Sequence, residues 1–254
     1  MKVDQVGEMG QVGEGGLNRR QINRLKNSEG IQKSTFTFLR ALERNNNRPW
    51  FNENKEKYLA EHEKTLSFVE KLLAEMNQLD ELEPMTPKKS LFRIYRDVRF
   101  SKDKSPYKNH FSGRMRRATK WKRGGYYYHL EPGNTIIAGG FWNPDSSDIK
   151  HIRKQIAADP KPLRKIIGSA SFKKLFGSLQ GDEVKTAPQG FSKEHPDIDL
   201  IRKKQFLVYR GFTNAEVHSD NFLKEVVKTF KGMGPFFGYM SDILTTDLNG
   251  APLE

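Results

Sequence analysis

The chain of 254 residues contains 35% hydrophobic residues and 17 phenylalanines, which is enough for a sizeable core and excludes a wholly disordered protein. It has no cysteine, which excludes disulfides, thiolate nucleophiles and cysteine-ligated zinc. Its formal net charge at pH 7 is +13. No apolar run approaches the roughly 20 residues that span a membrane, so no membrane partner is expected.

The first 30 residues contain six glycines and show no hydrophobic periodicity. They lack the apolar segment of a secretory signal, and the acidic residues Asp4 and Glu8 argue against a transit peptide. We therefore interpret residues 1–33 as a flexible tail that stays outside the core. The remainder, residues 34–250, is expected to form a single domain of a cytoplasmic protein.

The next stretch predicts helices. Ser34 is a suitable N-cap for a helix with apolar residues on one side, which the run Asn45-Asn46-Asn47 then ends. Pro49 is tolerated in a first helical turn, so a long second helix is predicted from there to about Gln78.

Residues 91–142 are predicted to form strands in succession. The segment Leu91–Tyr95 is aromatic and β-branched, which favours a strand. Three more strands are predicted, with turns between them, near Lys108–Arg117, at Tyr126–Glu131 and at Thr135–Trp142. Short connections between successive strands predict an antiparallel sheet.

Helical periodicity returns after the strands, at Ser147–Ala158, near Lys161–Gly168 and at Ser171–Phe176. One further strand is predicted at Gln205–Arg210, and Ser219 is predicted to cap a last pair of helices that breaks at Gly232–Gly234. This order predicts an α+β fold: one domain with a central antiparallel sheet of about four to five strands, covered by N-terminal and C-terminal helices.

The positive charge is concentrated in one window. Fourteen of the 36 residues from Lys88 to Arg123 are basic and only Asp97 and Asp103 are acidic, so this basic window carries +12 of the +13. A charge concentrated in this way usually faces an anion such as phosphate, nucleic acid or an acidic protein. The alternative is a solvated basic hairpin that aids solubility.

The most specific part of the basic window is residues 93–108. Strand alternation places Arg96 on an apolar face, where it needs either an anionic ligand or a carboxylate such as Glu43 or Glu53. On the opposite face Asp97 is positioned to orient Arg93 or Arg99, which would leave planar donors for a phosphate or carboxylate.

We predict a ligand site in this segment, the alternative being an exposed loop with scattered charges. Its candidate ligand-binding residues are Arg93, Arg96, Arg99, Ser101, Lys102, Lys104, Tyr107 and Lys108. If the protein is an enzyme acting on a phosphorylated or acidic substrate, the acid/base candidates are Asp97, Asp103 and His129. A third hypothesis is a basic module that docks an acidic protein.

Two features outside the segment have competing interpretations. Gly139-Gly140 allows close approach of a ligand or, alternatively, tight packing against another element. Tyr127, His129 and Glu131 share a strand face, which is typical of an aromatic platform beside cations or of ordinary tyrosine packing. The histidines show no metal-binding spacing, so neither a metal nor a cofactor is predicted.

Four stretches resemble one known family in the same order: FLRALERNNNRPWFNENKEKY, RIYRDVRFSKDKSPYK, YYYHLEPGNTIIAGGFWNPDSSDIKHIRKQI and APQGFSKEHPDIDLIRKKQF. The chain is similar over about Phe36 to Leu248 to the domain-of-unknown-function family 2461 of bacteria and fungi, whose long Arg-Asp-x-Arg-Phe-Ser-Lys-Asp-Lys-x-Pro-Tyr-Lys motif stands at residues 96–108. The resemblance implies a single domain and assigns no catalytic residue.

Overall fold

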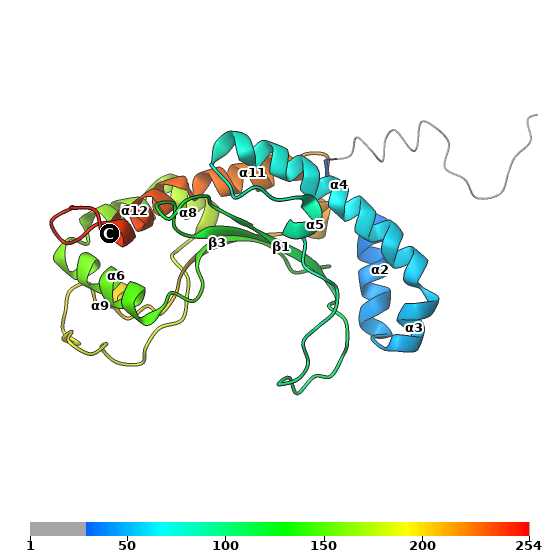
Figure 1. Ribbon diagram of the computed structural model, residues 1–254, viewed down its shortest axis with the longest axis horizontal. Coiled ribbons are helices and arrows are strands. Elements are labelled where there is room, and N and C mark those ends of the chain that lie inside the picture. The colour runs from blue at the N-terminus through cyan, green and yellow to red at the C-terminus, as the bar shows by residue number, and fades with distance from the viewer. Residues whose placement is uncertain (1–28, 254) are drawn as a thin grey trace, which may run out of the picture.

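The structure is a computed structural model that describes residues 29–253. Its centre is a four-stranded antiparallel sheet in the order β1-β2-β3-β4. The strands are β1 (Phe111–Arg116), β2 (Gly125–Leu130), β3 (Thr135–Phe141) and β4 (Phe206–Phe212). Helices precede, interrupt and follow the strands, so the α+β fold with a central antiparallel sheet is confirmed (Figure 1).

The helices fall into a group before the sheet, a group between β3 and β4, and a group after β4. They are α2 (Lys33–Arg44), α3 (Arg48–Glu53), α4 (Lys55–Leu79), α5 (Pro87–Ser90), α6 (Ser146–Ala158), α7 (Lys161–Gly168), α8 (Ala170–Phe176), α9 (Ile198–Ile201), α10 (Asn214–Val217), α11 (Phe222–Gly232) and α12 (Gly234–Thr245). Within residues 29–253, none of them combines the length and the apolar character that crossing a membrane requires.

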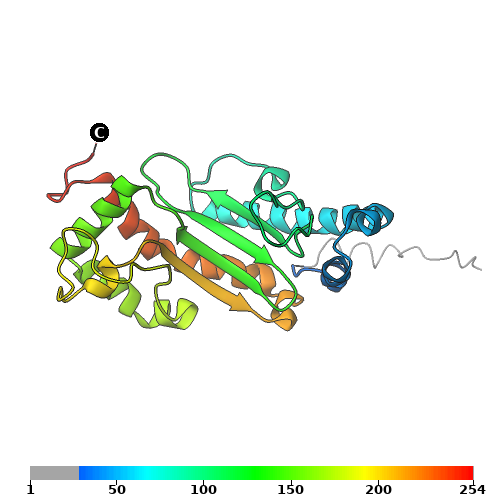
Figure 2. The same ribbon diagram turned by 90° about the horizontal axis from the view of Figure 1, so that it is seen from below.

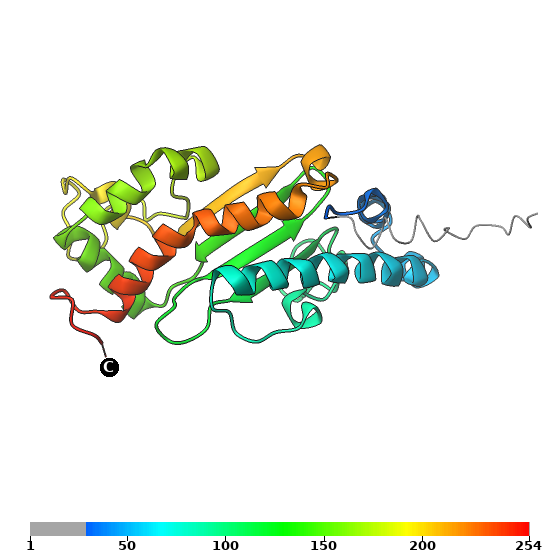
Figure 3. The same cartoon turned by 90° about the horizontal axis from the view of Figure 1, so that it is seen from above.

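Some of the helices cover one face of the sheet, whereas α2 and α3 lie beyond one end of the strands and α6 and α9 beyond the other (Figure 1). Figure 3 shows α4 and α11 lying over the strands, with α12 continuing from α11 past their ends, and Figure 2 shows the opposite face with the strands in front. The burial pattern also indicates one covered face, because side chains alternate between buried and partly exposed along β2 and β3. Tyr128 and Ile137, on the helix side, are both 0% exposed. We call the other side the open face.

The segment just before α2 belongs to the domain. Ile31 is buried, its amide donates to the carbonyl of Val217, and its carbonyl accepts from His218. The amide of Leu223 donates to the carbonyl of Glu29. The expectation that the tail extends to residue 33 is therefore wrong for residues 29–33, because one buried isoleucine in a Gly-rich stretch escapes a search for periodicity. The expectation for residues 1–28 lies outside the described residues.

The predicted helix ends differ in detail. Gln32, rather than Ser34, is the N-cap of α2, and the Ser34 hydroxyl donates to Glu61 instead. The long second helix is divided at Asn54 into α3 and α4. Asn221 rather than Ser219 precedes α11, whereas the predicted break between Gly232 and Gly234 is confirmed. Propensity locates such helices more reliably than it locates their ends.

Leu91–Tyr95 does not form a strand, which corrects the sequence-based prediction. The segment is extended, but it divides its partners: the Phe92 amide donates to the carbonyl of Ser112 in β1, whereas the Ile94 carbonyl accepts from Lys108. Only isolated bridges result, at Leu91 and Tyr95. Because no single neighbour continues along the segment, no regular ladder forms and the sheet has four strands.

The pair Gly139-Gly140 is explained by packing. A Cβ at Gly139 would lie 2.5 Å from the Met233 sulfur, and one at Gly140 would lie 2.2 Å from the backbone oxygen of Phe206. The glycines therefore allow the start of α12 and strand β4 to approach β3 closely, which favours the packing interpretation of this pair over the ligand interpretation.

Candidate functional site

The sequence motif forms a hairpin, here called the basic hairpin and defined as residues 93–108. Its two arms are joined by hydrogen bonds from the Arg96 amide to Pro106 O (2.9 Å) and from the Lys108 amide to Ile94 O (2.8 Å). Ile94 and Tyr107 anchor it, being 1% and 4% exposed. Figure 1 shows this segment projecting from the sheet on the side away from α11.

Arg96 closes the hairpin from inside. Its guanidinium pairs with Asp103, donates to the Ser105 carbonyl at 3.1 Å and lies 3.5 Å from the Ser101 hydroxyl. Its side chain is 27% exposed, so it is half-buried, and the expected partners Glu43 and Glu53 are not the ones it uses. The carboxylate comes instead from the turn seven residues further along the chain.

Arg99 and Asp97 form the second pair of the hairpin. Arg99 donates to Asp97 through Nε at 3.0 Å and through Nη2 at 2.7 Å. The sequence predicted that Asp97 orients one of its two neighbouring arginines, and Arg99 is that arginine. The alternation fails one residue later, because Phe100 is 97% exposed rather than turned toward the apolar side.

The two aspartates are poorly suited to acid/base chemistry near neutral pH. Hydrogen bonds from Arg99 lower the pKa of Asp97. Hydrogen bonds from Ser105 and then Arg96 lower the pKa of Asp103 to about 2. Each carboxylate is therefore ionised and already occupied in holding the hairpin together, so neither is ready to take up or release a proton.

The other candidate binding residues divide into structural and exposed ones. Lys104 donates to Val98 O and Lys108 to Arg93 O, so both ammonium groups brace the backbone. The buried ring of Tyr107 stacks on Phe51 with centroids 3.9 Å apart and is not presented to a ligand. Arg93, Lys102 and Lys104 are exposed, so Lys104 both braces the backbone and faces solvent.

Outside the hairpin, acidic residues from other segments offset much of the basic window. Arg117 pairs with Asp80 at 2.6 Å, Lys122 lies 3.3 Å from the same carboxylate, and Arg123 pairs with Asp148. These cations lie in the loop between β1 and β2, and they connect it to Asp80 after α4 and to Asp148 in α6. The outward-facing positive charge is consequently smaller than the linear sequence suggests.

The open face carries a second group of polar and aromatic residues. The register places Arg114, Tyr127, Ala138 and Tyr209 side by side across β1, β2, β3 and β4. Arg114 is exposed, Tyr127 is half-buried and Tyr209 is 44% exposed. We call these four residues the cross-strand row.

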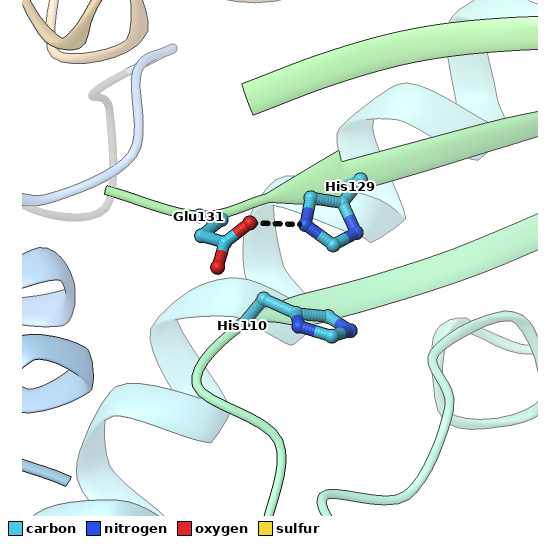
Figure 4. Close-up of side chains that lie close together, drawn as sticks. All are labelled: His110, His129 and Glu131. Atoms are coloured by element: carbon cyan, nitrogen blue, oxygen red, sulfur yellow. Dashed lines mark hydrogen bonds and ion pairs between the residues drawn. The ribbon is translucent and has the colours of Figure 1, made fainter. Parts of the chain in front are cut away.

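One end of the open face brings two histidines and a glutamate together (Figure 4). The His129 Nε2 lies 2.8 Å from Glu131 Oε2, and the ring centroids of His110 and His129 are 4.0 Å apart. Because Phe111 pairs with Leu130 and Ser112 with His129, His110 precedes β1 beside the end of β2 and lies diagonal to His129. We call this trio the His–His–Glu cluster.

Neighbouring groups fix the orientation and charge of the cluster. Burial, and then the charge of His129, lower the pKa of His110 to about 4. Burial alone would raise the pKa of Glu131, but hydrogen bonds from His129 and Asn134 outweigh it and lower that pKa. His110 follows the last residue of the basic hairpin by two positions, and the charges of Lys108 and Arg96 also lower its pKa.

Comparison with known proteins identifies the family. A family model described as "Conserved hypothetical protein (DUF2461)" matches residues 34–239. The chain belongs to this family. No curated protein and no solved structure matches it. Membership in DUF2461 confirms the resemblance seen in the motifs but says nothing of activity, which has to be argued from the geometry.

In this DUF2461 member, sequence reasoning found part of the site and missed the rest. It placed Tyr127, His129 and Glu131 on one strand face, and burial and register agree. It missed His110 because this residue is 19 positions from His129 and joins it only through the β1–β2 register. Alternation along one strand is visible in a sequence, whereas the register across a long loop is not.

Replacing Arg96 by alanine is expected to lower the unfolding free energy by about 1–2 kcal/mol, because the Ser105 carbonyl loses its donor and the turn its ion pair. Replacing Arg93, an exposed residue of the same hairpin, should have much less effect. Urea unfolding followed by circular dichroism measures both variants, and equal midpoints would contradict the role given to Arg96.

Proposed function

We propose that this protein binds a phosphate-bearing anion, with single-stranded nucleic acid as its ligand, on the open face and the adjoining basic hairpin. The observation that carries the proposal is the cross-strand row, in which Arg114 and the two partly exposed tyrosines lie on the side of the sheet away from the helices. Cations beside aromatic rings on an accessible sheet are the features that sequence-tolerant binders of single strands use.

The row offers two different kinds of contact. Tyr209 is 44% exposed and presents a ring on which a base can stack, whereas Arg114 presents a guanidinium that can contact the phosphate backbone. Ala138 lies between the tyrosines and carries only a methyl group, so it adds little bulk to the centre of the row. A flat base can be accommodated there at little steric cost.

The basic hairpin extends this surface at the β1 edge. Its exposed cations Arg93 and Lys102 are accompanied by Tyr95 and Phe100, which are 52% and 97% exposed. Arg96 and Arg99 hold the hairpin in shape through Asp103 and Asp97. In this proposal the ligand contacts the hairpin through its exposed residues, while the paired arginines have a largely structural role.

Binding is expected to depend strongly on salt, because each phosphate neutralised on a single strand contributes a slope of roughly −0.7 to log K against log [salt]. Fluorescence anisotropy with a labelled oligonucleotide at several salt concentrations measures it. Changing Arg93 and Lys102 together to glutamate should weaken binding and reduce the slope by about 1.4. The matched control changes the exposed Lys173 and Lys174 of α8 to glutamate and should bind like the wild type.

Tyr209→Ala tests the stacking contact separately and should weaken binding by about 1–3 kcal/mol for one stacked base. If the wild type fails to bind the oligonucleotide at low salt, nucleic acid is excluded. If both double charge reversals weaken binding equally, the contact is nonspecific attraction to a basic protein, and the assignment to the hairpin fails.

An enzyme acting on a phosphorylated or acidic substrate is the second candidate, and one observation favours it. His129, among the three acid/base candidates, lies between a tyrosine hydroxyl and the Glu131 carboxylate, as a histidine oriented for proton transfer does. A variant His129→Gln that retains oligonucleotide binding but loses turnover of a phosphate ester would support this candidate; a wild type without turnover would exclude it for that ester.

A further inference from the structure

We propose that the His–His–Glu cluster binds a divalent transition-metal ion through His110, His129 and Glu131. The site goes beyond the proposed function and does not depend on it. Two imidazoles and one carboxylate are a donor set that first-row divalent ions accept, and three protein ligands leave a coordination position for water or an anion. An open position of this kind is characteristic of catalytic rather than structural metal sites.

The donor atoms are close enough to converge on one ion. One ligand atom from each of the three side chains can be chosen so that all lie within 4.8 Å of one another. At metal–ligand distances of about 2.1 Å, tetrahedral geometry separates two donor atoms by roughly 3.4 Å. The donor atoms therefore have to approach one another by up to about 1.4 Å, a movement that we assign to rotation of the side chains.

Each histidine has a hydrogen-bond partner at Nδ1. The Tyr127 hydroxyl lies 3.1 Å from His129 Nδ1, and the Asn109 side-chain oxygen lies 3.2 Å from His110 Nδ1. For His129 this arrangement leaves Nε2, which lies beside the Glu131 carboxylate, as the nitrogen available to an ion. Metal-binding histidines are generally oriented in this way by a hydrogen bond at the nitrogen that does not coordinate.

The carboxylate is supported as well. Asn109 donates to Glu131 Oε1 and Asn134 donates to Glu131 Oε2, each at 2.7 Å. Asn109 also donates to Glu43 at 3.1 Å, which brings a second negative charge from α2 near the cluster. The Glu131 side chain is 18% exposed and that of His129 14%, so the site is shielded but reachable from the open face.

The competing explanation is a hydrogen-bonded cluster that only connects β1 to β2. In that case the proton between His129 Nε2 and Glu131 is the permanent occupant of the space. In the metal-bound state the ion takes the place of this proton on Nε2, the proton moves through solvent to Nδ1, and Nδ1 then donates to the Tyr127 hydroxyl oxygen. The two explanations predict different responses to added metal, so they can be separated by experiment.

The experiment titrates the metal-free full chain with Co²⁺, followed by visible absorption, and with Zn²⁺, followed by calorimetry. One ion per chain is expected, with the intense visible bands of a four- or five-coordinate Co²⁺ site. His110→Gln and Glu131→Gln should each bind at least tenfold more weakly than the wild type. His195→Gln, which changes a histidine in the loop before α9, is the control and should bind normally.

A second variant addresses the orienting hydrogen bond. Tyr127→Phe removes only the hydroxyl beside His129 and should weaken Zn²⁺ binding roughly tenfold, which is the usual effect of losing such a partner. If His110→Gln or Glu131→Gln does not fold by circular dichroism, this variant decides instead, and an affinity equal to that of the wild type overturns the proposal.

The results separate this site from the proposed function. Failure of the wild type to bind either ion, or binding that His110→Gln and Glu131→Gln leave unchanged, overturns the metal site. Oligonucleotide binding measured in excess chelator reports on the proposed function alone. Loss of one without the other shows which of the two assignments is wrong.

Discussion

Replacing Asp80 by alanine is expected to lower the unfolding free energy by about 3–5 kcal/mol, the cost of leaving one partner of a buried ion pair uncompensated. Asp80 and Arg117 have side chains only 11% and 10% exposed, and they are joined at 2.6 Å. The Tyr126 hydroxyl donates to the same carboxylate at 2.7 Å. Without Asp80, the Nε of Arg117 and the Tyr126 hydroxyl both lose the acceptor that they share, and the guanidinium loses its carboxylate partner.

The structure around Arg117 explains why it cannot simply turn to solvent. Its guanidinium also donates to Arg123 O and to the Ser241 hydroxyl, and it lies 5.1 Å over the Phe237 ring. These contacts join the loop after β1 to α12. Loss of Asp80 should therefore loosen the connection between the sheet and the C-terminal helices as well as one ion pair.

The effect of Asp80 should depend on pH. Burial would raise its pKa, but hydrogen bonds from Tyr126 and Arg117 outweigh this and hold the pKa below its usual value. A carboxyl with a lowered folded-state pKa stabilises the protein above the unfolded-state pKa of about 3.9 and loses this contribution as the pH falls through the folded-state value. The difference between wild type and Asp80→Ala should shrink on acidification.

Urea unfolding at neutral pH and at acid pH tests both statements. Asp220→Ala is the matched control, since Asp220 is an exposed aspartate in the turn before α11. The control should unfold close to the wild type at neutral pH. An Asp80→Ala variant that loses no more stability than Asp220→Ala would show that the buried ion pair does not hold the sheet to α12.

This ion pair also changes how the basic window is understood. Arg117, Lys122 and Arg123 are attracted to acidic residues that lie outside the window in sequence, so they contribute to folding as well as to surface potential. The exposed cations are mainly those of the hairpin and of β1, such as Arg93, Lys102 and Arg114. A ligand site therefore has to be sought there rather than evenly along residues 88–123.

The sequence predicted those helices and strands that pack along their whole length against the same part of the protein. Strands β2, β3 and β4 and helices α6, α7 and α8 lie close to their predicted ranges, because each has a continuous apolar face. The strand predicted at Leu91–Tyr95 was wrong because the hydrogen bonds of this segment are divided between β1 and its own hairpin. The pairing of an extended segment is a tertiary property that local propensity does not contain.

The candidate site was predictable only within single segments. Pairing of Asp97 with Arg99 follows from a spacing of two residues, and the shared face of His129 and Glu131 follows from alternation. The pairing of Arg96 with Asp103 depends on how the turn closes, and the meeting of His110 with His129 depends on the β1–β2 register. Both are decided by the folded arrangement.

Replacing Gly113 by alanine is expected to destabilise the protein by about 3 kcal/mol, at the upper end of the usual cost of overpacking. Gly113 lies in β1 opposite Tyr128, on the helix side of the sheet. An added Cβ would lie 2.1 Å from the Tyr128 hydroxyl oxygen and 2.4 Å from the backbone oxygen of Ser90. Tyr128 is fully buried and hydrogen-bonded to Ser90, so neither atom can move away cheaply.

Gly211→Ala is the matched control, and the pair tests the one-sided architecture on which the proposed binding surface depends. Gly211 lies in β4 on the open face, and among residues 29–253 no atom comes within 4 Å of a Cβ placed there. Alanine should therefore be tolerated, with a change of no more than about 1 kcal/mol in either direction. Thermal and urea unfolding measure both variants. A Gly211→Ala variant as unstable as Gly113→Ala would mean that the open face is covered, which would remove the surface proposed for the ligand.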